Sequence, residues 1–124
     1  MDKFKDTTIA AINAVIAQGA QSKNDTECAY KGYDGLKCLV GHMIQDCYYH
    51  PELESKDISN ADVVDAVEQS LGTCLNHKDL RILNNLQRAH DMPCYPTHFL
   101  DKFKERIIQY TKQNELPEWC ITWE

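Results

Sequence analysis

The chain lacks the features that would assign it at once to a membrane or to a known reaction. No apolar run approaches the ~20 residues that a membrane-spanning helix needs. The first residues carry mixed charge and include no apolar core of a secretory signal. No nucleophile, base and orienting group stand in a recognised catalytic spacing, and no cofactor motif is present. We therefore expect a cytoplasmic protein that enters no membrane, needs no cofactor and acts by binding more readily than as an enzyme.

Glycine and proline are also few, with five and four residues in 124, and no internal repeat or low-complexity linker divides the chain. A chain of this length suits one domain with a single modest core. Hydrophobic residues make up 43% and charged residues 26%, which is ordinary for a globular protein. The formal net charge of −6 argues against direct binding to nucleic acid. We predict a single domain over residues 1–124.

Six cysteines are present, but no two of them form the C-x2-C pair that is typical of structural zinc sites. Thiol and imidazole ligands stand near one another at Cys38-x3-His42-x4-Cys47, Cys74-x2-His77 and Cys94-x3-His98. We interpret the cysteines as small buried side chains with reduced thiols, and we predict no metal site.

The segment from Glu27 to Glu54 predicts a β-hairpin. Two short runs, 27–30 and 36–40, are rich in residues that suit strands, and a glycine-rich turn at 32–35 joins them. Such a turn sets Cys28 opposite Cys38 on facing strands. Residues 42–49 then form either a short helix or a turn, because the residue before a proline avoids the helical region.

Elsewhere the apolar spacing is helical. It predicts helices at about 3–20, between the Ser59–Asp62 capping signal and Gly72, from about Leu80 to Asp91, and at about 97–114. A lone hairpin is unstable in water, so it must be covered by these helices or gain a third strand, for which the alternating tail 119–123 is the candidate. We predict an α+β fold in which one hairpin packs against four or five helices.

Three stretches carry a resemblance to a known family: Cys28-Ala29-Tyr30, Leu36-Lys37-Cys38-Leu39-Val40-Gly41 and, more weakly, Leu86-Gln87-Arg88-Ala89-His90-Asp91. Met43-Ile44, Asp46, Tyr48 or Tyr49, and Pro51-Glu52 follow the second stretch in the same order. With these motifs the chain resembles a family of small uncharacterised proteins from phages and prophages. The resemblance implies an origin in a mobile element and carries over no function. Gln45 stands where a proline is usual in that family.

The region from Asp46 to Glu68 is strongly acidic. Its carboxylates face a single permanently charged base, Lys56. They are Asp46, Glu52, Glu54, Asp57, Asp62, Asp65 and Glu68. Such a region could dock on a basic protein surface or mimic nucleic-acid phosphate. An acidic helix that only keeps the protein in solution is the alternative.

Tyrosines gather in and just after the predicted hairpin, at positions 30, 33, 48 and 49. Tyrosine combines a large apolar area with a polar tip, which makes it common in binding surfaces. Tyr33 is expected at the exposed tip of the turn beside Asp34. The predicted binding residues are Tyr33, Asp34, Asp46, Tyr49, Glu52, Glu54, Asp62 and Asp65.

Three functions remain open at this point. The first is a small accessory protein that binds a host protein with a basic surface and thereby inhibits it, for example in a defence system. The second is a module that sequesters a nucleotide-like ligand among the tyrosines. The third is a small enzyme that uses Cys38, His42 or Asp91, which lacks support because no complete catalytic set is found in the sequence.

Overall fold

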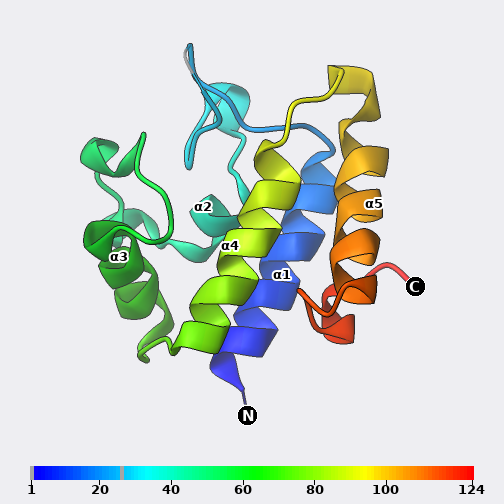
Figure 1. The fold of residues 1–124 in the computed structure, drawn as a ribbon. Coiled ribbons are helices and arrows are strands. Elements are labelled where there is room, and N and C mark those ends of the chain that lie inside the picture. Colours follow the sequence, from blue (N-terminus) through cyan, green and yellow to red (C-terminus); the bar gives the residue numbers. More distant parts are fainter. Residues whose placement is uncertain (1, 26) are drawn as a thin grey trace.

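The structure is a computed structural model that describes residues 2–25 and 27–124. Its helices are α1 (Lys3–Gln18), α2 (Leu39–Met43), α3 (Ala61–Leu71), α4 (His77–Asp91) and α5 (Phe99–Lys112) (Figure 1). Short 3-10 turns lie in the connecting loops at Tyr33–Gly35, Asp46–Tyr48, Pro51–Leu53, Pro96–His98 and Glu118–Cys120. Across the described residues, no helix is both long enough and apolar enough to cross a membrane.

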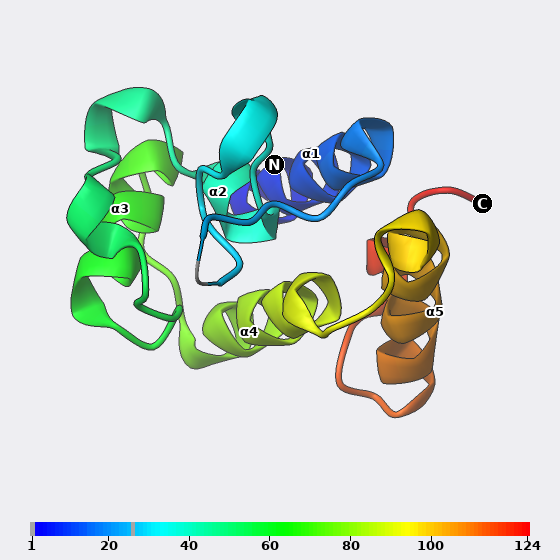
Figure 2. The ribbon, with the colours of Figure 1, turned by 90° about the horizontal axis from the view of Figure 1, so that it is seen from above.

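The short helix α2 lies in the middle of the molecule. It contacts α1, α3 and α4, and Figure 2 shows these three helices arranged around it. Its apolar residues Leu39, Val40 and Met43 are all buried, and they join side chains from the longer helices in one core. α5 packs against α4 on the side of the molecule that lies away from α3 (Figure 1).

The predicted β-hairpin is wrong, and the predicted α+β fold class is wrong with it. The chain is helical over 62% of its length, and its described part contains no β-strand, so the fold is all-α. An isolated β-bridge pairs Lys23 with Cys28, where the prediction paired Cys28 with Cys38. Both of these thiols are free.

The second predicted strand instead leads into α2. Backbone N–H groups in this segment have hydrogen-bond acceptors of the kind that the first turn of a helix needs. Cys38 is the N-cap residue, and its Sγ accepts a hydrogen bond from the Gly41 N–H at 3.4 Å. The Val40 N–H donates to Oε1 of Gln87 on α4 at 3.0 Å. These bonds satisfy donors that the first turn of a helix leaves without internal partners. Contacts distant in the sequence thus override the local preference for a strand.

The predicted long helices are confirmed, and the first and last end within two residues of their predicted limits. α3 begins after Asn60, whose side chain accepts a hydrogen bond from the Asp62 N–H, and it ends at Gly72, where φ is 75°. α4 begins with a capping box between Asn76 and Asp79. Local capping signals therefore set these helix ends.

The tail after α5 forms no third strand. Trp119 lies against Phe4 of α1 with ring centroids 6.4 Å apart, and Cys120 is buried. The Lys104 amine of α5 lies 5.8 Å from the centroid of the Trp123 ring. The alternating apolar residues of the tail therefore pack on α1 and α5.

Gly41 lies directly against the backbone of Tyr30. A Cβ at position 41 would overlap the Tyr30 carbonyl oxygen and lie 2.9 Å from the carbonyl carbon. We expect Gly41→Ala to lower the free energy of unfolding by about 2 kcal/mol or more, because the overlap is with rigid backbone. The ~1 kcal/mol that alanine gains over glycine inside a helix would not offset this cost.

Urea denaturation measures the change, and Gly35→Ala is the control. A Cβ at Gly35 meets no atom within 4 Å, so only its positive φ of 73° opposes the substitution. That strain costs about 1 kcal/mol. A Gly41→Ala protein as stable as the wild type would show that the contact with Tyr30 is not rigid.

Candidate functional site

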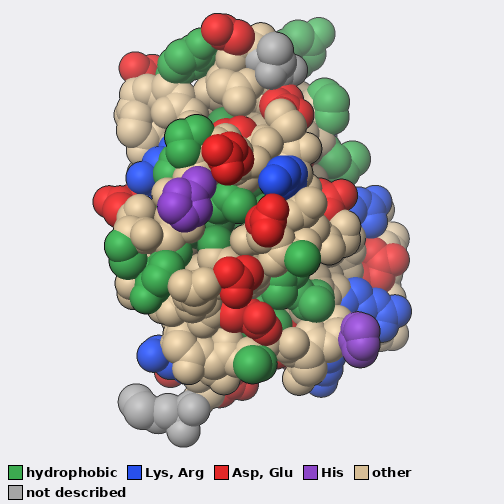
Figure 3. Space-filling model, turned by 90° about the vertical axis from the view of Figure 1, so that its left-hand side faces the viewer, with side chains coloured by type: hydrophobic (Ala, Val, Ile, Leu, Met, Phe, Trp, Pro, Cys, Tyr) green, Lys and Arg blue, Asp and Glu red, His purple; other side chains and the backbone are tan. Residues whose placement is uncertain are grey.

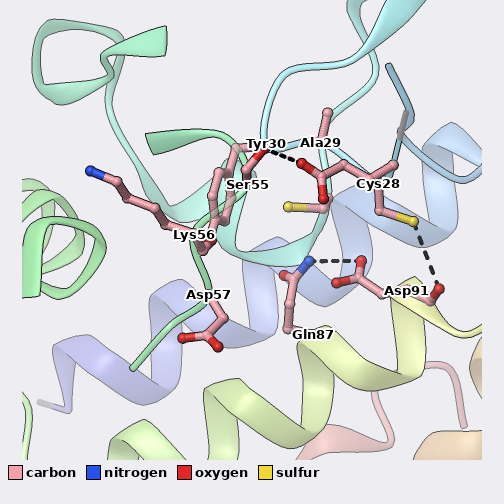
Figure 4. Close-up of a pocket in the computed structure, with 10 residues that line it drawn as sticks. Cys28, Ala29, Tyr30, Ser55, Lys56, Asp57, Gln87 and Asp91 are labelled. Carbon is pink, nitrogen blue, oxygen red and sulfur yellow. Dashed lines mark hydrogen bonds between the residues drawn. The ribbon is translucent and has the colours of Figure 1, made fainter. Parts of the chain in front are cut away.

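The hollow in Figure 4 forms where three segments distant in the sequence meet. It has a volume of about 190 Å³ and lies between the loop before α2, the loop at 55–57 and the end of α4. Its lining residues are Glu27, Cys28, Ala29, Tyr30, Cys38, Ser55, Lys56, Asp57, Gln87 and Asp91. Residues of the stretches 28–30, 36–41 and 86–91 all contribute to this lining.

Asp91, at the end of α4, is held by two neighbours on the same helix. Its Oδ1 accepts hydrogen bonds from Nδ1 of His90 at 2.7 Å and from Nε2 of Gln87 at 2.9 Å. The Sγ of Cys28 lies 3.7 Å from the backbone carbonyl oxygen of Asp91. The side chains of Cys28, His90 and Asp91 each bring one possible metal-ligand atom within 4.8 Å of the others.

Both ring nitrogens of His90 are engaged within the fold. The backbone N–H of Ser22 donates to Nε2 at 3.1 Å, so Nε2 carries no proton. The proton of the neutral ring is then on Nδ1, which donates it to the Asp91 carboxylate. A metal ion at Nδ1 would displace that proton, and a metal ion at Nε2 would break the bond to Ser22. His90, which is 0% exposed, therefore joins the loop at Ser22 to the end of α4.

Neither thiol beside the hollow is a ready nucleophile. Burial raises the pKa of Cys28 to about 12, and the nearby Asp91 carboxylate contributes to that rise. Burial also raises the pKa of Cys38, which is 1% exposed. The thiolate is the reactive form of cysteine, and both groups remain protonated thiols near neutral pH. The cluster of Cys28, His90 and Asp91 thus holds the loop in place and does not activate a thiol.

We expect no stoichiometric zinc in the purified protein. The cluster offers a protonated thiol at Cys28 and an imidazole at His90 whose two nitrogens already have partners. Elemental analysis measures the zinc content, and a chelator should leave the melting temperature unchanged. One zinc ion per chain, whose removal lowers the melting temperature, would contradict this prediction.

His42, the other residue of the predicted thiol site, faces α1. Its Nε2 lies 3.0 Å from Oε1 of Gln18. Burial lowers the pKa of His42 to about 4, and the positive charge of Lys37 contributes to that shift. An imidazole of this pKa is a weak base near neutral pH, so His42 does not serve a catalytic thiol.

We expect stability to fall as the pH drops from about 6.5, the ordinary pKa of histidine, to about 4. In that range the unfolded chain binds a proton at His42 that the folded chain does not bind, so acid favours unfolding. His42→Gln keeps a donor for Gln18 and removes the titration. Its melting temperature should fall less than that of the wild type over this range, and equal losses would contradict the shift.

Three hollows lie side by side and form one surface, which we call the acidic trough. The hollow of Figure 4 shares Lys56 with a hollow of about 240 Å³ beside α3, and it shares Glu27, Cys28 and Asp91 with one of about 550 Å³. The carboxylates of the trough, all exposed, are Asp25, Glu27, Glu52, Asp57, Asp62, Asp65 and Asp91. Figure 3 shows acidic side chains gathered on the side of the molecule that carries α3.

Few positive charges balance these carboxylates. The lysines of the trough are Lys23 and Lys56. Lys56 forms an ion pair with Asp62 at 3.2 Å. Among the described residues, no other lysine pairs with a trough carboxylate. His50 also lines the hollow beside α3. The trough therefore carries an excess of negative charge that the fold does not neutralise.

The structure places some of the predicted binding residues at this surface. Glu52, Asp62 and Asp65 line the hollow beside α3. Tyr33 borders the other end of the trough, because its hydroxyl donates a hydrogen bond to Asp25. Asp34 follows Tyr33 in the same 3-10 turn, where its φ is 60°.

The other predicted binding residues serve the fold. Glu54 accepts hydrogen bonds from the backbone N–H groups of Tyr30 at 3.0 Å and Lys31 at 3.1 Å, and from the Tyr49 hydroxyl at 2.7 Å. Asp46 pairs with Lys31 at 2.8 Å, and this bond lowers the pKa of Asp46. Glu54, Tyr49 and Asp46 thus hold their loop against the loop before α2.

The predicted binding set omits four carboxylates of the trough. Asp57 lies inside the acidic region from Asp46 to Glu68, so the sequence contained the signal that could have added it to the set. Asp25, Glu27 and Asp91 come from segments outside that region, and no local count of charge could join them to it. His90 was omitted as well, since its role depends on a contact with Ser22, which is 68 residues away in the chain.

No protein-family model, curated protein or solved structure matches this chain.

Proposed function

We propose that this protein acts by binding a basic partner protein through the acidic trough. The observation that carries the proposal is the joining of three hollows into one surface with seven exposed carboxylates and two lysines. Lysine and arginine side chains of a partner fit such hollows, since each can place its charged head among carboxylates and its stem along the wall. A field of one sign also raises the rate of encounter with a partner of opposite sign.

The charge of the trough carboxylates supports a binding role, because several of them bond within the fold to neutral groups that leave this charge unbalanced. Glu54 and Asp46 are engaged with the loop before α2, while most of the trough carboxylates lie on the surface without a lysine or arginine partner among the described residues. Like charges that gather in this way repel one another and destabilise the folded state slightly. A bound basic partner would relieve that repulsion.

A nucleotide site among the tyrosines has less support. Tyr30 lines the hollow of Figure 4, Tyr48 lines the hollow beside α3, and the hydroxyls of Tyr33 and Tyr49 donate to Asp25 and Glu54. The tyrosines are therefore spread over separate places. The hollows that they line are acidic and would repel a nucleotide phosphate.

The test reverses two charges of the trough. Asp62→Lys with Asp65→Lys should weaken the binding of a fluorescent arginine-rich peptide by roughly tenfold or more, because like charges replace attractive ones. Fluorescence anisotropy measures the affinity. Binding by the wild type should weaken as salt is added, since surface charges are screened over a Debye length of about 8 Å at physiological salt.

A matched control makes the same change of charge elsewhere. Asp101 and Glu105 are exposed on α5, which lies across the molecule from α3 in Figure 1. Asp101→Lys with Glu105→Lys changes the net charge equally and should reduce the affinity far less. Equal losses in the two double variants would show that only net charge matters, and an unchanged affinity in the α3 variant would refute the trough as the binding site.

A further inference from the structure

A second surface of the molecule has the opposite character. A hollow of about 840 Å³ lies between the amino-terminal half of α4 and the loop that precedes α3. Its basic lining residues are His77, Lys78 and Arg81, and none of the described residues that line it is acidic. On a chain with a net charge of −6, such a lining is unexpected.

Two basic side chains of this hollow, Lys78 and Arg81, also border a neighbouring hollow of about 350 Å³ that Glu115 lines. Lys78 and Arg81 are exposed, and neither forms an ion pair or a hydrogen bond with another described residue. They stand three positions apart on one face of α4, where like charges destabilise a helix by a few tenths of a kcal/mol. An anion placed between them would remove that repulsion.

The position of these charges along α4 is also unfavourable for stability. His77 and Lys78 are the first two residues of the helix, after the N-cap Asn76. The amino-terminal end of a helix carries a partial positive charge, so cations are disfavoured there and anions are favoured. Local rules are broken most often at functional sites, which makes these residues candidates for a role in binding.

The hollow also offers apolar surface and a neutral polar group. Ile58 and Leu80 contribute apolar surface, and the Asn84 side chain supplies an amide. A hollow of this size, with an apolar wall and a few polar groups, is typical of sites for small organic ligands. A free inorganic ion would leave the apolar wall unused.

We propose that this hollow binds a small organic anion whose charged group lies between Lys78 and Arg81 and whose apolar body lies against Ile58 and Leu80. The site shares no lining residue with the acidic trough, although Asp57 of the trough accepts a hydrogen bond from the backbone N–H of Ser59, which lines the site. The proposal does not depend on the function proposed for the trough. Attraction to the charged group supplies selectivity for anions, and burial of the apolar body supplies affinity.

The probe for this site is anilinonaphthalene sulfonate, a dye with one negative charge and an apolar body whose fluorescence rises when it leaves water. The wild type should bind one dye molecule at this site, and added salt should weaken the binding. Lys78→Gln with Arg81→Gln should weaken it by roughly tenfold, because both charges that face the sulfonate are removed. Binding of the neutral dye Nile red should change far less.

Two controls separate binding from folding and from net charge. Lys102→Gln with Lys112→Gln removes two exposed charges from α5 and should leave the affinity for the sulfonate dye unchanged. The Lys78/Arg81 variant should melt no lower than the wild type, since it loses an unfavourable charge near the start of α4. An equal loss of affinity in the two double variants, or a lower melting temperature of the Lys78/Arg81 variant, would overturn the proposal.

The two proposals fail separately. Asp62→Lys with Asp65→Lys should weaken binding of the basic peptide by roughly tenfold or more without weakening that of the sulfonate dye. The dye could also lose affinity both in this variant and in the Lys78/Arg81 variant. Its binding would then not be specific to the α4 hollow, and the site proposed here would be refuted.

Discussion

The contact between Gly41 and the backbone of Tyr30 is the constraint on which the rest of the structure depends. Because position 41 has no side chain, the loop before α2 can lie directly on that helix. The Tyr30 N–H then reaches Glu54, and the Tyr30 hydroxyl reaches the carbonyl oxygen of Lys56. One close approach therefore brings the loop, α2 and the segment at 54–56 together, and the hollow of Figure 4 lies where they meet α4.

Side chains supply hydrogen-bond partners for the backbone of this loop. In a β-hairpin, the neighbouring strand would supply them. The Ser22 hydroxyl lies 2.7 Å from the Ala29 carbonyl oxygen, and Nε2 of His90 accepts the Ser22 N–H. An unsatisfied buried donor costs about 1–3 kcal/mol, so these contacts decide where the loop can lie. His90, Glu54 and in part Asp91 are thus occupied by contacts within the fold.

The charges that remain are segregated. Carboxylates gather in the acidic trough, while Lys78 and Arg81 line one hollow to which no described acidic residue contributes and a smaller one that Glu115 lines. Repulsion within each group lowers stability slightly. Two surfaces of opposite sign on so small a protein are consistent with two different ligands, a basic protein at one and an organic anion at the other.

The sequence by itself determined the long helices, because their apolar spacing and their caps are local. Asn60, Gly72 and the Asn76–Asp79 capping box act within a few residues, and α1, α3, α4 and α5 lie where the pattern placed them. It also located part of the acidic trough, since Glu52, Asp62 and Asp65 belong to one acidic stretch of the chain. Only the tertiary structure decided the conformation of residues 27–54. There the glycine-rich turn and strand-like runs favour a hairpin locally, but the Val40 N–H finds Gln87 and the Tyr30 N–H finds Glu54, partners that lie 47 and 24 residues away. Bonds between such distant residues form only when the helices have packed, so local propensity could not reveal them.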